Sequence, residues 1–332
     1  MIISKTPLRI SFLGGNTDLP KFYRKEFGCV ISTAIDKYVY LAIHPNFEPH
    51  IRIQYTKNEF VSSIEEIENT RVKAVLEKFK HENPEFNEHL VIHSIADVPA
   101  KTGLGSSSSF LISLLHALHA QQNKNVSISN RRLAEEAVEI ELNILKEPIG
   151  KQDQYIASFG GLRYIQFNPD ESVLIEPIIC SSETKKTLEN NLLMFYTGET
   201  RSASDILNKL NNHINNDTVF KDLIKLRDLT LRMKEKLSNN NLEDFGLLLD
   251  QGWKIKKNLS DNISNSFIDE IYEKAIKAGA QGGKLLGAGA SGFLLFYCEE
   301  DRQDNVRKAL SNLKEFQFKF ESEGSRIIHM EN

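Results

Sequence analysis

The sequence lacks the features of disulfide-stabilised and membrane-spanning proteins. Its three cysteines, Cys29, Cys180 and Cys298, are far apart in 332 residues and form no Cys-x-x-Cys pair, so neither a disulfide framework nor a zinc site is indicated. No apolar run reaches the roughly 18 residues that a membrane-spanning helix needs. Lys5 and Arg9 interrupt the apolar N-terminal residues, so no signal peptide is evident. We therefore expect a cytoplasmic protein in a reducing setting, with no membrane partner.

An excess of charge of one sign is also missing. The chain has 41 Lys and Arg against 45 Asp and Glu, which gives a formal net charge of −4, and its pI is near 6.2. A protein that binds nucleic acid generally has a basic excess, so a nucleic-acid partner is not expected. A charged small-molecule substrate is compatible with this balance.

Several common nucleotide-binding signatures are absent. There is no Walker A motif, and the His-Arg-Asp and Asp-Phe-Gly motifs of protein kinases are missing, so those mechanisms are excluded. Residues 287–292 satisfy Gly-x-Gly-x-x-Gly, but a predicted strand at 293–297 follows where a dinucleotide fold needs a helix. Arg307 and Lys308 stand where an acid should bind the ribose, so that interpretation is rejected.

Patterning predicts an α+β protein with two domains. The 40% hydrophobic content is typical of a globular chain long enough to bury a large core. The polar stretch 181–186 is the predicted boundary, with an N-terminal domain at 1–180 and a C-terminal domain at 187–332. Strands are predicted at 8–14, 28–35, 38–44, 51–55, 90–95, 161–168, 172–179, 191–196, 293–297, 316–320 and 325–329, the last two finishing the C-terminal domain. Helices are predicted at 62–82, from 110 onward, and at 130–146, 202–215, 217–238, 241–258, 265–278 and 306–313.

The most informative stretch is residues 99–109, a glycine- and serine-rich loop before a helix. Gly103 and Gly105 allow tight turns and let backbone N–H groups approach an anion closely. The following serines begin a helix, whose unpaired amides and positive dipole end attract phosphate. A serine hydroxyl there can also reach a metal ion on the phosphates. An ordinary serine-capped helix after a flexible loop is the alternative.

Three segments together resemble the GHMP small-molecule kinases, named for galactokinase, homoserine, mevalonate and phosphomevalonate kinases. Residues 99–107 match the family's phosphate loop, Pro-x3-Gly-Leu-Gly-Ser-Ser, and residues 7–18 and 283–292 match its N-terminal and C-terminal glycine segments. The resemblance implies a ribosomal-protein-S5-like N-terminal α/β domain and a ferredoxin-like C-terminal domain with added helices. It also implies ATP as phosphoryl donor, bound by loop residues Pro99, Lys101, Gly103, Leu104, Gly105, Ser106, Ser107 and Ser108.

The resemblance also assigns the metal site and the catalytic residues. In the family, a glutamate on the helix after the phosphate loop holds Mg²⁺, and Glu141 fits best, together with Ser107. Glu139 is the fallback because the turn at 148–150 leaves the register uncertain. Asp153 is the expected catalytic residue, accepting the proton of the attacking hydroxyl or orienting it, and Arg9 is expected beside it. For Asp153, a helix N-cap is the structural alternative.

The acceptor side is predicted less directly. In related kinases the segment after the first strand contacts the acceptor, so Asp18 is expected to hydrogen-bond sugar hydroxyls, although a solvated ion pair with Arg9 is the alternative. Cations are the expected partners of a phosphate on the acceptor. The complete set of acceptor candidates is Asp18, Gly15, Asn16, Lys151, Arg163, Arg201 and Gly289.

Residues 6–19 and 196–205 look most like the bacterial D-glycero-D-manno-heptose 7-phosphate kinases. This similarity implies phosphorylation of the anomeric hydroxyl of that sugar phosphate to the 1,7-bisphosphate, for nucleotide-activated heptose and surface glycan synthesis. A neutral-sugar kinase, such as a fucokinase or hexosamine kinase, and a regulatory nucleotide-binding module without turnover are the alternatives. The basic residues Lys151, Arg163 and Arg201 favour the sugar phosphate. Homodimer formation is left open.

Overall fold

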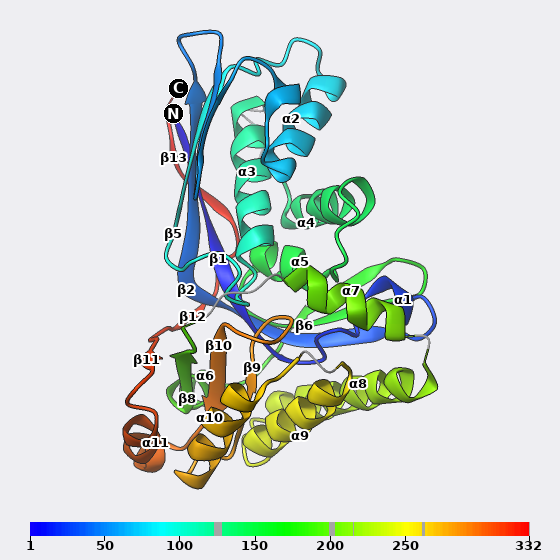
Figure 1. Cartoon of the computed structure of the whole chain (residues 1–332), viewed down its shortest axis with the longest axis vertical. Coiled ribbons are helices and arrows are strands. Elements are labelled where there is room, and N and C mark those ends of the chain that lie inside the picture. Colours follow the sequence, from blue (N-terminus) through cyan, green and yellow to red (C-terminus); the bar gives the residue numbers. More distant parts are fainter. Residues whose placement is uncertain (123–127, 199–202, 215, 261–262, 332) are drawn as a thin grey trace.

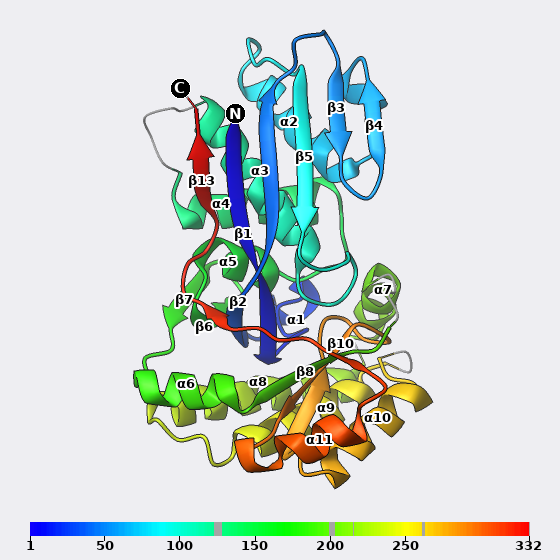
Figure 2. The same ribbon diagram turned by 90° about the vertical axis from the view of Figure 1, so that its left-hand side faces the viewer.

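The structure is a computed structural model that describes residues 1–122, 128–198, 203–214, 216–260 and 263–331. Two sheets divide it into an upper and a lower half (Figures 1 and 2). Within these ranges, no helix combines the length and apolarity needed to cross a bilayer.

The upper half is built on a mostly antiparallel sheet of nine described strands, with β13-β1-β2-β5-β3-β4 as its main order. Its longest strand, β2, pairs with β1 along most of their length and with β5 and β6 on its other edge. The remaining members, β12 and β7, pair with β2 and β6. The strand bounds are β1 Ile2–Leu13, β2 Gly28–Pro45, β3 Ile51–Gln54, β4 Asn58–Val61, β5 Leu90–Ala96, β6 Leu162–Phe167, β7 Val173–Pro177, β12 Phe320–Glu321 and β13 Arg326–Met330.

Helices cover one face of this sheet, as Figure 1 shows. The central helix α3 buries leucines such as Leu111, Leu114 and Leu118 against apolar strand residues of β2 and β5. Its apolar spacing explains why it forms the core of the layer. The helical segments of this half are α1 Pro20–Tyr23, a 3₁₀ turn at Ile64–Glu66, α2 Thr70–Glu82, α3 Ser106–Gln122, α4 Asn130–Val138, a π-helical turn at Glu139–Ile144 and α5 Gln152–Phe159.

The lower half holds an antiparallel sheet in the order β11-β8-β10-β9, packed against helices. Trp253 and Phe296 are central to its core. Its strands are β8 Leu192–Tyr196, β9 Gly282–Leu285, β10 Phe293–Tyr297 and β11 Lys314–Glu315. Its helices are α6 Ser182–Asn190, α7 Ala203–His213, α8 Asp217–Ser238, α9 Phe245–Asn258, α10 Ser266–Lys277, a 3₁₀ turn at Glu300–Arg302 and α11 Gln303–Ala309.

The mixed helix and sheet content confirms the predicted fold class, but some elements differ. The predicted strands 28–35 and 38–44 are one strand, β2, and residues 181–186 begin helix α6 instead of an open linker. The prediction that strands 316–320 and 325–329 finish the C-terminal domain is wrong, because β12 and β13 pair with β2 and β1 of the first sheet. Both chain ends therefore meet there, where the Met1 ammonium lies 3.1 Å from a Glu331 carboxylate oxygen. The predicted domain boundary between residues 180 and 187 stays a prediction.

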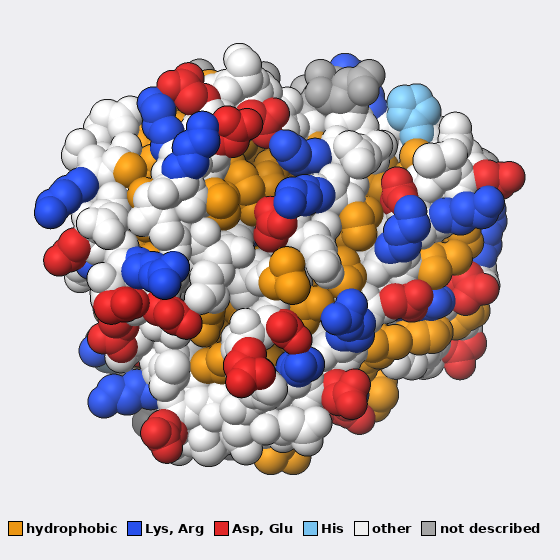
Figure 3. All heavy atoms as spheres, turned by 90° about the horizontal axis from the view of Figure 1, so that it is seen from below, with side chains coloured by type: hydrophobic (Ala, Val, Ile, Leu, Met, Phe, Trp, Pro, Cys, Tyr) orange, Lys and Arg blue, Asp and Glu red, His pale blue; other side chains and the backbone are white. Residues whose placement is uncertain are grey.

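The lower end of the molecule, seen in Figure 3, carries acidic and basic side chains interspersed with apolar ones. On this face the two signs of charge alternate, as expected from the nearly balanced composition.

Candidate active site

A pocket of about 360 Å³ lies between the first sheet and the lower half. Its walls come from β1 and the turn that follows it, the loop before α3, the start of α5, and residues of α9, β9 and the loop after β9. It brings together most of the predicted site residues, namely Arg9, Gly15, Asn16, Asp18, Lys101, Gly103, Gly105, Ser106, Ser107, Ser108, Glu141 and Asp153.

The glycine loop has the backbone form that the sequence predicts. Lys101, Gly103 and Gly105 have φ values of 63°, 83° and 77°, in the left-handed region that favours glycine. A Cβ on Gly103 would lie 2.5 Å from the carbonyl oxygen of Leu286, and one on Gly105 would lie 3.1 Å from Cγ of Arg9. The two glycines are therefore also required for packing, against the C-terminal glycine segment and against the arginine. Helix α3 begins at Ser106, so its first amides face the pocket as an anion site.

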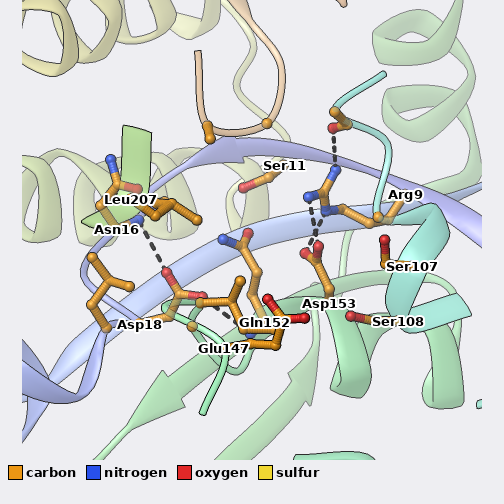
Figure 4. Close-up of a pocket in the computed structure, with 18 of the residues that line it drawn as sticks. Arg9, Ser11, Asn16, Asp18, Ser107, Ser108, Glu147, Gln152, Asp153 and Leu207 are labelled. Carbon is orange, nitrogen blue, oxygen red and sulfur yellow. Dashed lines mark hydrogen bonds and ion pairs between the residues drawn. The ribbon is translucent and has the colours of Figure 1, made fainter. Parts of the chain in front are cut away.

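Arg9 and Asp153 form a bidentate ion pair at the centre of the pocket. Arg9 Nε donates to Asp153 Oδ1 over 2.7 Å, and Nη2 donates to Oδ2 over 2.9 Å. Arg9 Nη1 also donates to the carbonyl oxygen of Gly103 over 2.6 Å, which ties the pair to the glycine loop. Arg9 is 5% exposed. In Figure 4 the pair lies between Ser107 and Ser108 on one side and Asp18 on the other.

Glu141 is fully buried at the end of the pocket near the serines. Its Oε2 accepts hydrogen bonds from Ser108 Oγ (2.8 Å) and Gln154 Nε2 (2.6 Å), and its Oε1 accepts one from Arg71 Nε (3.0 Å). Burial raises the pKa of this carboxyl, and the positive charge of Arg71 opposes that shift. The predicted helix 130–146 turns π-helical at Glu139–Ile144, which the sequence did not predict. Glu139 is exposed, so the structure places Glu141 at the pocket.

Asp18 occupies the opposite end of the pocket. Its Oδ1 accepts the N–H of Asn16 over 3.0 Å and its Oδ2 accepts the N–H of Gln152 over 3.1 Å. Burial raises its pKa to about 6, and these two hydrogen bonds oppose the shift while the charge of Asp153 adds to it. A solvated ion pair with Arg9, the alternative considered above, is therefore wrong, since Arg9 pairs with Asp153 and Asp18 is 2% exposed.

The polar groups at this end of the pocket include three buried atoms that have no partner among the described residues: Ser11 Oγ, Asn16 Nδ2 and Gln152 Oε1. All three residues line the pocket. Buried polar atoms normally find a hydrogen-bond partner. This end of the pocket can therefore take a ligand with several hydroxyl groups.

Several pocket residues were not predicted from the sequence, namely Ser11, Arg71, Glu147, Gln152, Lys256 and Lys284. Arg71 lies on α2, Lys256 on α9 and Lys284 on β9, far in the chain from the glycine loop. Gln152 stands next to Asp153, and Ser11 and Lys284 lie inside the segments 7–18 and 283–292 that match the family. Arg71, Glu147 and Lys256 had no signal beyond their residue type.

The structure places other predicted residues outside this pocket. Lys151 turns away: its Nζ donates to Glu171 and lies 4.5 Å from the Tyr23 ring centroid. Arg163 is held on β6, where its Nε donates to the carbonyl oxygen of Gly160 over 2.8 Å. Gly289 packs closely against the backbone of Ile263: a Cβ added to this glycine would lie 2.8 Å from Cα of Ile263. None of these three residues lines the pocket, and their assignment to the acceptor stays a prediction.

The remaining predicted positions shape the loop or lie outside the described residues. Pro99 accepts a hydrogen bond from Thr102 Oγ1 over 3.0 Å, and buried Leu104 accepts the N–H of Arg9 over 3.1 Å. Both fix the loop without lining the pocket. Arg201 lies outside the described residues.

No cluster of three or more His, Cys, Asp or Glu side chains stands ready for a metal ion in the part of the chain that the structure describes. A metal ion coordinated entirely by protein side chains would need such a cluster. Mg²⁺ in nucleotide sites is commonly held by one or two carboxylates together with substrate phosphates. Glu141 with the neighbouring serine hydroxyls fits that smaller donor set.

Comparison with known proteins identifies a family for this chain. The family described as GHMP kinases N terminal domain matches residues 70–161, and the family described as GHMP kinases C terminal matches residues 233–317. The chain is 27% identical to the D-glycero-alpha-D-manno-heptose 7-phosphate kinase of Campylobacter jejuni over 97% of each chain. It is 24% identical to the galactokinase of Pyrococcus furiosus, covering 96% of this chain and 94% of that one.

The fold is likewise shared with solved structures. A D-glycero-D-manno-heptose 1-phosphate kinase from Bacteroides thetaiotaomicron superposes with a TM-score of 0.82 at 23% identity, with each chain fully covered. The two family matches lie on either side of the pocket and include the glycine loop and Asp153 in one half and Lys256 and the C-terminal glycine segment in the other. On sequence, fold and pocket alike, this chain belongs to the GHMP kinase family.

Proposed function

We propose that the protein is an ATP-dependent sugar kinase that phosphorylates the anomeric hydroxyl of D-glycero-D-manno-heptose 7-phosphate, giving the 1,7-bisphosphate. The observation that carries the proposal is the position of the Arg9–Asp153 pair, between an anion site at the start of α3 and a hydroxyl-binding end around Asp18. A donor phosphate on one side and a sugar on the other would meet at this pair.

The nucleotide end has donors for phosphate oxygens. Lys101 and the first amides of α3 face the pocket, and the exposed Ser107 adds a hydroxyl. Glu141 and the serine hydroxyls are the residues that would hold Mg²⁺, which neutralises charge on the phosphates when bound. Arg71 contacts Glu141 Oε1 over 3.0 Å and Glu147 over 3.2 Å, so it keeps both carboxylates in place.

Asp153 is the residue that receives or orients the proton of the attacking hydroxyl. Phosphoryl transfer depends chiefly on positioning and electrostatics, and a positioned carboxylate adds to both. The two hydrogen bonds from Arg9 fix the carboxylate plane, and the link from Arg9 to Gly103 fixes that plane relative to the phosphate loop. Arg9 also supplies positive charge beside the transferred group.

Asp18, Asn16 and Gln152 would hold the sugar. Asp18 accepts hydroxyl protons, the Asn16 amide nitrogen donates, and Gln152 Oε1 accepts. The intact Arg9–Asp153 pair and the buried Glu141 favour a catalytic protein over a regulatory nucleotide-binding module.

The relatives differ in the sugar phosphate that their names give: one relative is a heptose 7-phosphate kinase, and one structural neighbour is described as a heptose 1-phosphate kinase. The choice of heptose 7-phosphate as acceptor and of its anomeric hydroxyl as the phosphorylated position is therefore part of the proposal. A place in nucleotide-activated heptose and surface glycan synthesis follows if the product is the 1,7-bisphosphate. Cys29, Cys180 and Cys298 are unpaired thiols, which supports a cytoplasmic location.

The test is ATP consumption with a panel of acceptors: heptose 7-phosphate, heptose 1-phosphate, neutral heptose, fucose, galactose and N-acetylhexosamine. We expect kcat/KM to be highest for heptose 7-phosphate, with phosphorus NMR showing a new anomeric phosphate. Preference for a neutral sugar would replace the proposal with a fucokinase or hexosamine kinase. Absence of turnover with every sugar would contradict a sugar kinase.

A further inference from the structure

Two lysines from the lower half are buried in the pocket. Lys256 comes from α9 and Lys284 from β9, and they are 5% and 6% exposed. Charged lysines are rarely this buried unless they are paired. Both line the pocket, and both also line a smaller cavity that adjoins it.

Neither ammonium has a carboxylate partner among the residues that the structure describes. Lys284 Nζ donates to the carbonyl oxygens of Ser11 (2.7 Å) and Phe12 (2.9 Å), and Lys256 Nζ donates to the carbonyl oxygen of Gly287. These acceptors are neutral. By contrast, the pocket arginines are paired with acids, Arg9 with Asp153 and Arg71 with Glu141 and Glu147.

The two buried charges are therefore uncompensated. Burial lowers the pKa of Lys256 to about 8, with Arg9 adding to the effect and Asp18 opposing it. Burial lowers the pKa of Lys284 as well, and Lys256 and Arg9 contribute. An ionised group in such a place needs an opposite charge to offset its desolvation. An anionic ligand would supply it.

Lys284 lies on the acceptor side of the catalytic pair, and Lys256 lies between the two ends, because its Nζ donates to the carbonyl oxygen of Gly287, whose backbone packs against Gly103 of the glycine loop. Lys284 is bonded to the carbonyl of Ser11, which stands two residues after Arg9 on β1, toward the turn that carries Asp18. Figure 4 shows Ser11 between Arg9 and Asn16. The charges of Arg9 and, less strongly, Asp18 both act on Lys256. Ser11 Oγ is buried and has no hydrogen-bond partner in the described part of the chain.

We propose that Lys256, Lys284 and Ser11, which we term the buried lysine cluster, bind a phosphate monoester carried by the acceptor. The proposal rests on the proposed kinase function and deepens it by naming residues that select a sugar phosphate over a neutral sugar. A phosphate monoester carries close to two negative charges at neutral pH. Two ammonium groups match that charge, and the Ser11 hydroxyl supplies a further donor. The donor phosphates have their own groups at the other end, in Lys101, the α3 amides and Arg9.

The first test measures anion binding without turnover. Trp253 is the single tryptophan of the chain, lies three residues before Lys256 on α9, and lines the small cavity with both lysines. Its fluorescence is followed during titration with inorganic phosphate, with the nucleotide site saturated by a non-hydrolysable ATP analogue. We expect a saturable fluorescence change. The apparent Kd for phosphate should rise at least tenfold in Lys256→Met and stay close to the wild-type value in Lys256→Arg.

Lys254→Met is the matched control. Lys254 lies on the same helix, is 68% exposed and pairs with Asp250, so it should leave phosphate binding unchanged. Equal weakening in the control and in Lys256→Met would overturn the proposal. So would a phosphate signal that is seen without the ATP analogue and lost in its presence, because the cluster would then serve the donor phosphate. Lys284→Met also removes a link between β9 and β1, so the conclusion depends on Lys256.

The second test separates acceptors. In Lys256→Met, the KM for the sugar phosphate should rise about ten- to a hundredfold, while kcat, the KM for ATP and kcat/KM for the neutral sugar stay within about threefold. An equal loss with both acceptors would assign Lys256 to catalysis or structure and overturn the proposal. If wild-type protein phosphorylates no sugar, the kinase proposal fails, and the phosphate titration still decides whether the cluster binds an anion.

Discussion

The two ends of the pocket meet their hydrogen-bonding and charge requirements in different ways. At the glycine-loop end, the two carboxylates have charged partners: the buried Glu141 pairs with Arg71, and the partly buried Asp153 pairs with Arg9. At the Asp18 end, the amide groups of Asn16 and Gln152 have buried atoms without partners. Among the residues that the structure describes, the two buried lysines of the pocket donate only to neutral carbonyl groups.

This difference indicates which end is complete before a ligand arrives. The loop end is preorganised, because its backbone and ion pairs are fixed by the protein itself. The Asp18 end carries uncompensated groups that a ligand would satisfy, so it should reduce the stability of the free protein. Binding of a polar, anionic ligand there should therefore stabilise the fold strongly.

The largest effect should come from Asp153, where the two ends meet. Asp153→Asn removes the charge and basicity of the carboxylate at nearly constant shape, so kcat should fall about 10²- to 10⁴-fold. Binding of ATP, measured by calorimetry, should stay within a few-fold of wild type, because the loop donors remain. A variant with kcat close to wild type would remove Asp153 from catalysis.

The buried Asp18 at the acceptor end should make the unfolding free energy of the free protein depend on pH. Its folded pKa is about 6 against an ordinary value of 3.8, so between these pH values the folded protein keeps a proton that the unfolded chain has lost. Stability of the wild type should therefore fall as pH rises through this window, by about 3 kcal/mol in total, and stay lowered above it.

Asp18→Asn lacks this titration. The unfolding free energy of the variant minus that of wild type should grow by about 3 kcal/mol between roughly pH 3.5 and pH 7 in denaturant titrations. Asp301→Asn, at an exposed position, serves as the control. If the difference in unfolding free energy does not change with pH, burial does not raise the pKa of Asp18.

Glu141 tests the loop end. Glu141→Gln removes the charge of the carboxylate that fits Mg²⁺, so the Mg²⁺ concentration for half-maximal activity should rise about tenfold or more. Glu139→Gln is the matched control, because Glu139 is exposed on the same π-helical turn and is bonded to Asn143. The opposite result, a shift with Glu139→Gln alone, would show that the wrong glutamate was assigned.

The smallest effect is expected outside the pocket. Arg163→Ala loses a hydrogen bond to Gly160 and contact with the Phe159 ring, so the free energy of unfolding should fall by roughly 1 kcal/mol. The kcat/KM values for both substrates should stay within about twofold of wild type. A large rise in the acceptor KM would return Arg163 to the site.

The loop end could be predicted from sequence because its determinants are adjacent in the chain. Gly103 and Gly105 signal a turn, and the serines and leucines after them signal the start of a helix. The same holds for the helices of the lower half, where α8 matches its predicted bounds of 217–238. Local turn chemistry and periodicity carry this information.

The acceptor end could not be predicted in the same way. Lys256 and Lys284 reach the pocket from α9 and β9, and although Lys284 lies in the glycine segment that matches the family, neither local sequence shows that these elements face β1. Lys151 and Arg163 were predicted as substrate contacts from their charge and neighbourhood, but charge does not show toward which side a residue points. Glu141 depended on resemblance, because a π-helical turn changes the register that an α-helical pattern predicts.

The return of β13 to the edge of β1 also bears on how the protein is made. Residues 1–180, produced alone, would leave β1 as an unpaired edge strand, and such edges promote aggregation. During synthesis, β1 leaves the ribosome long before its partner at 326–330, which follows only after the whole lower half has been made. The upper half should therefore finish folding last, although its first strand is translated first.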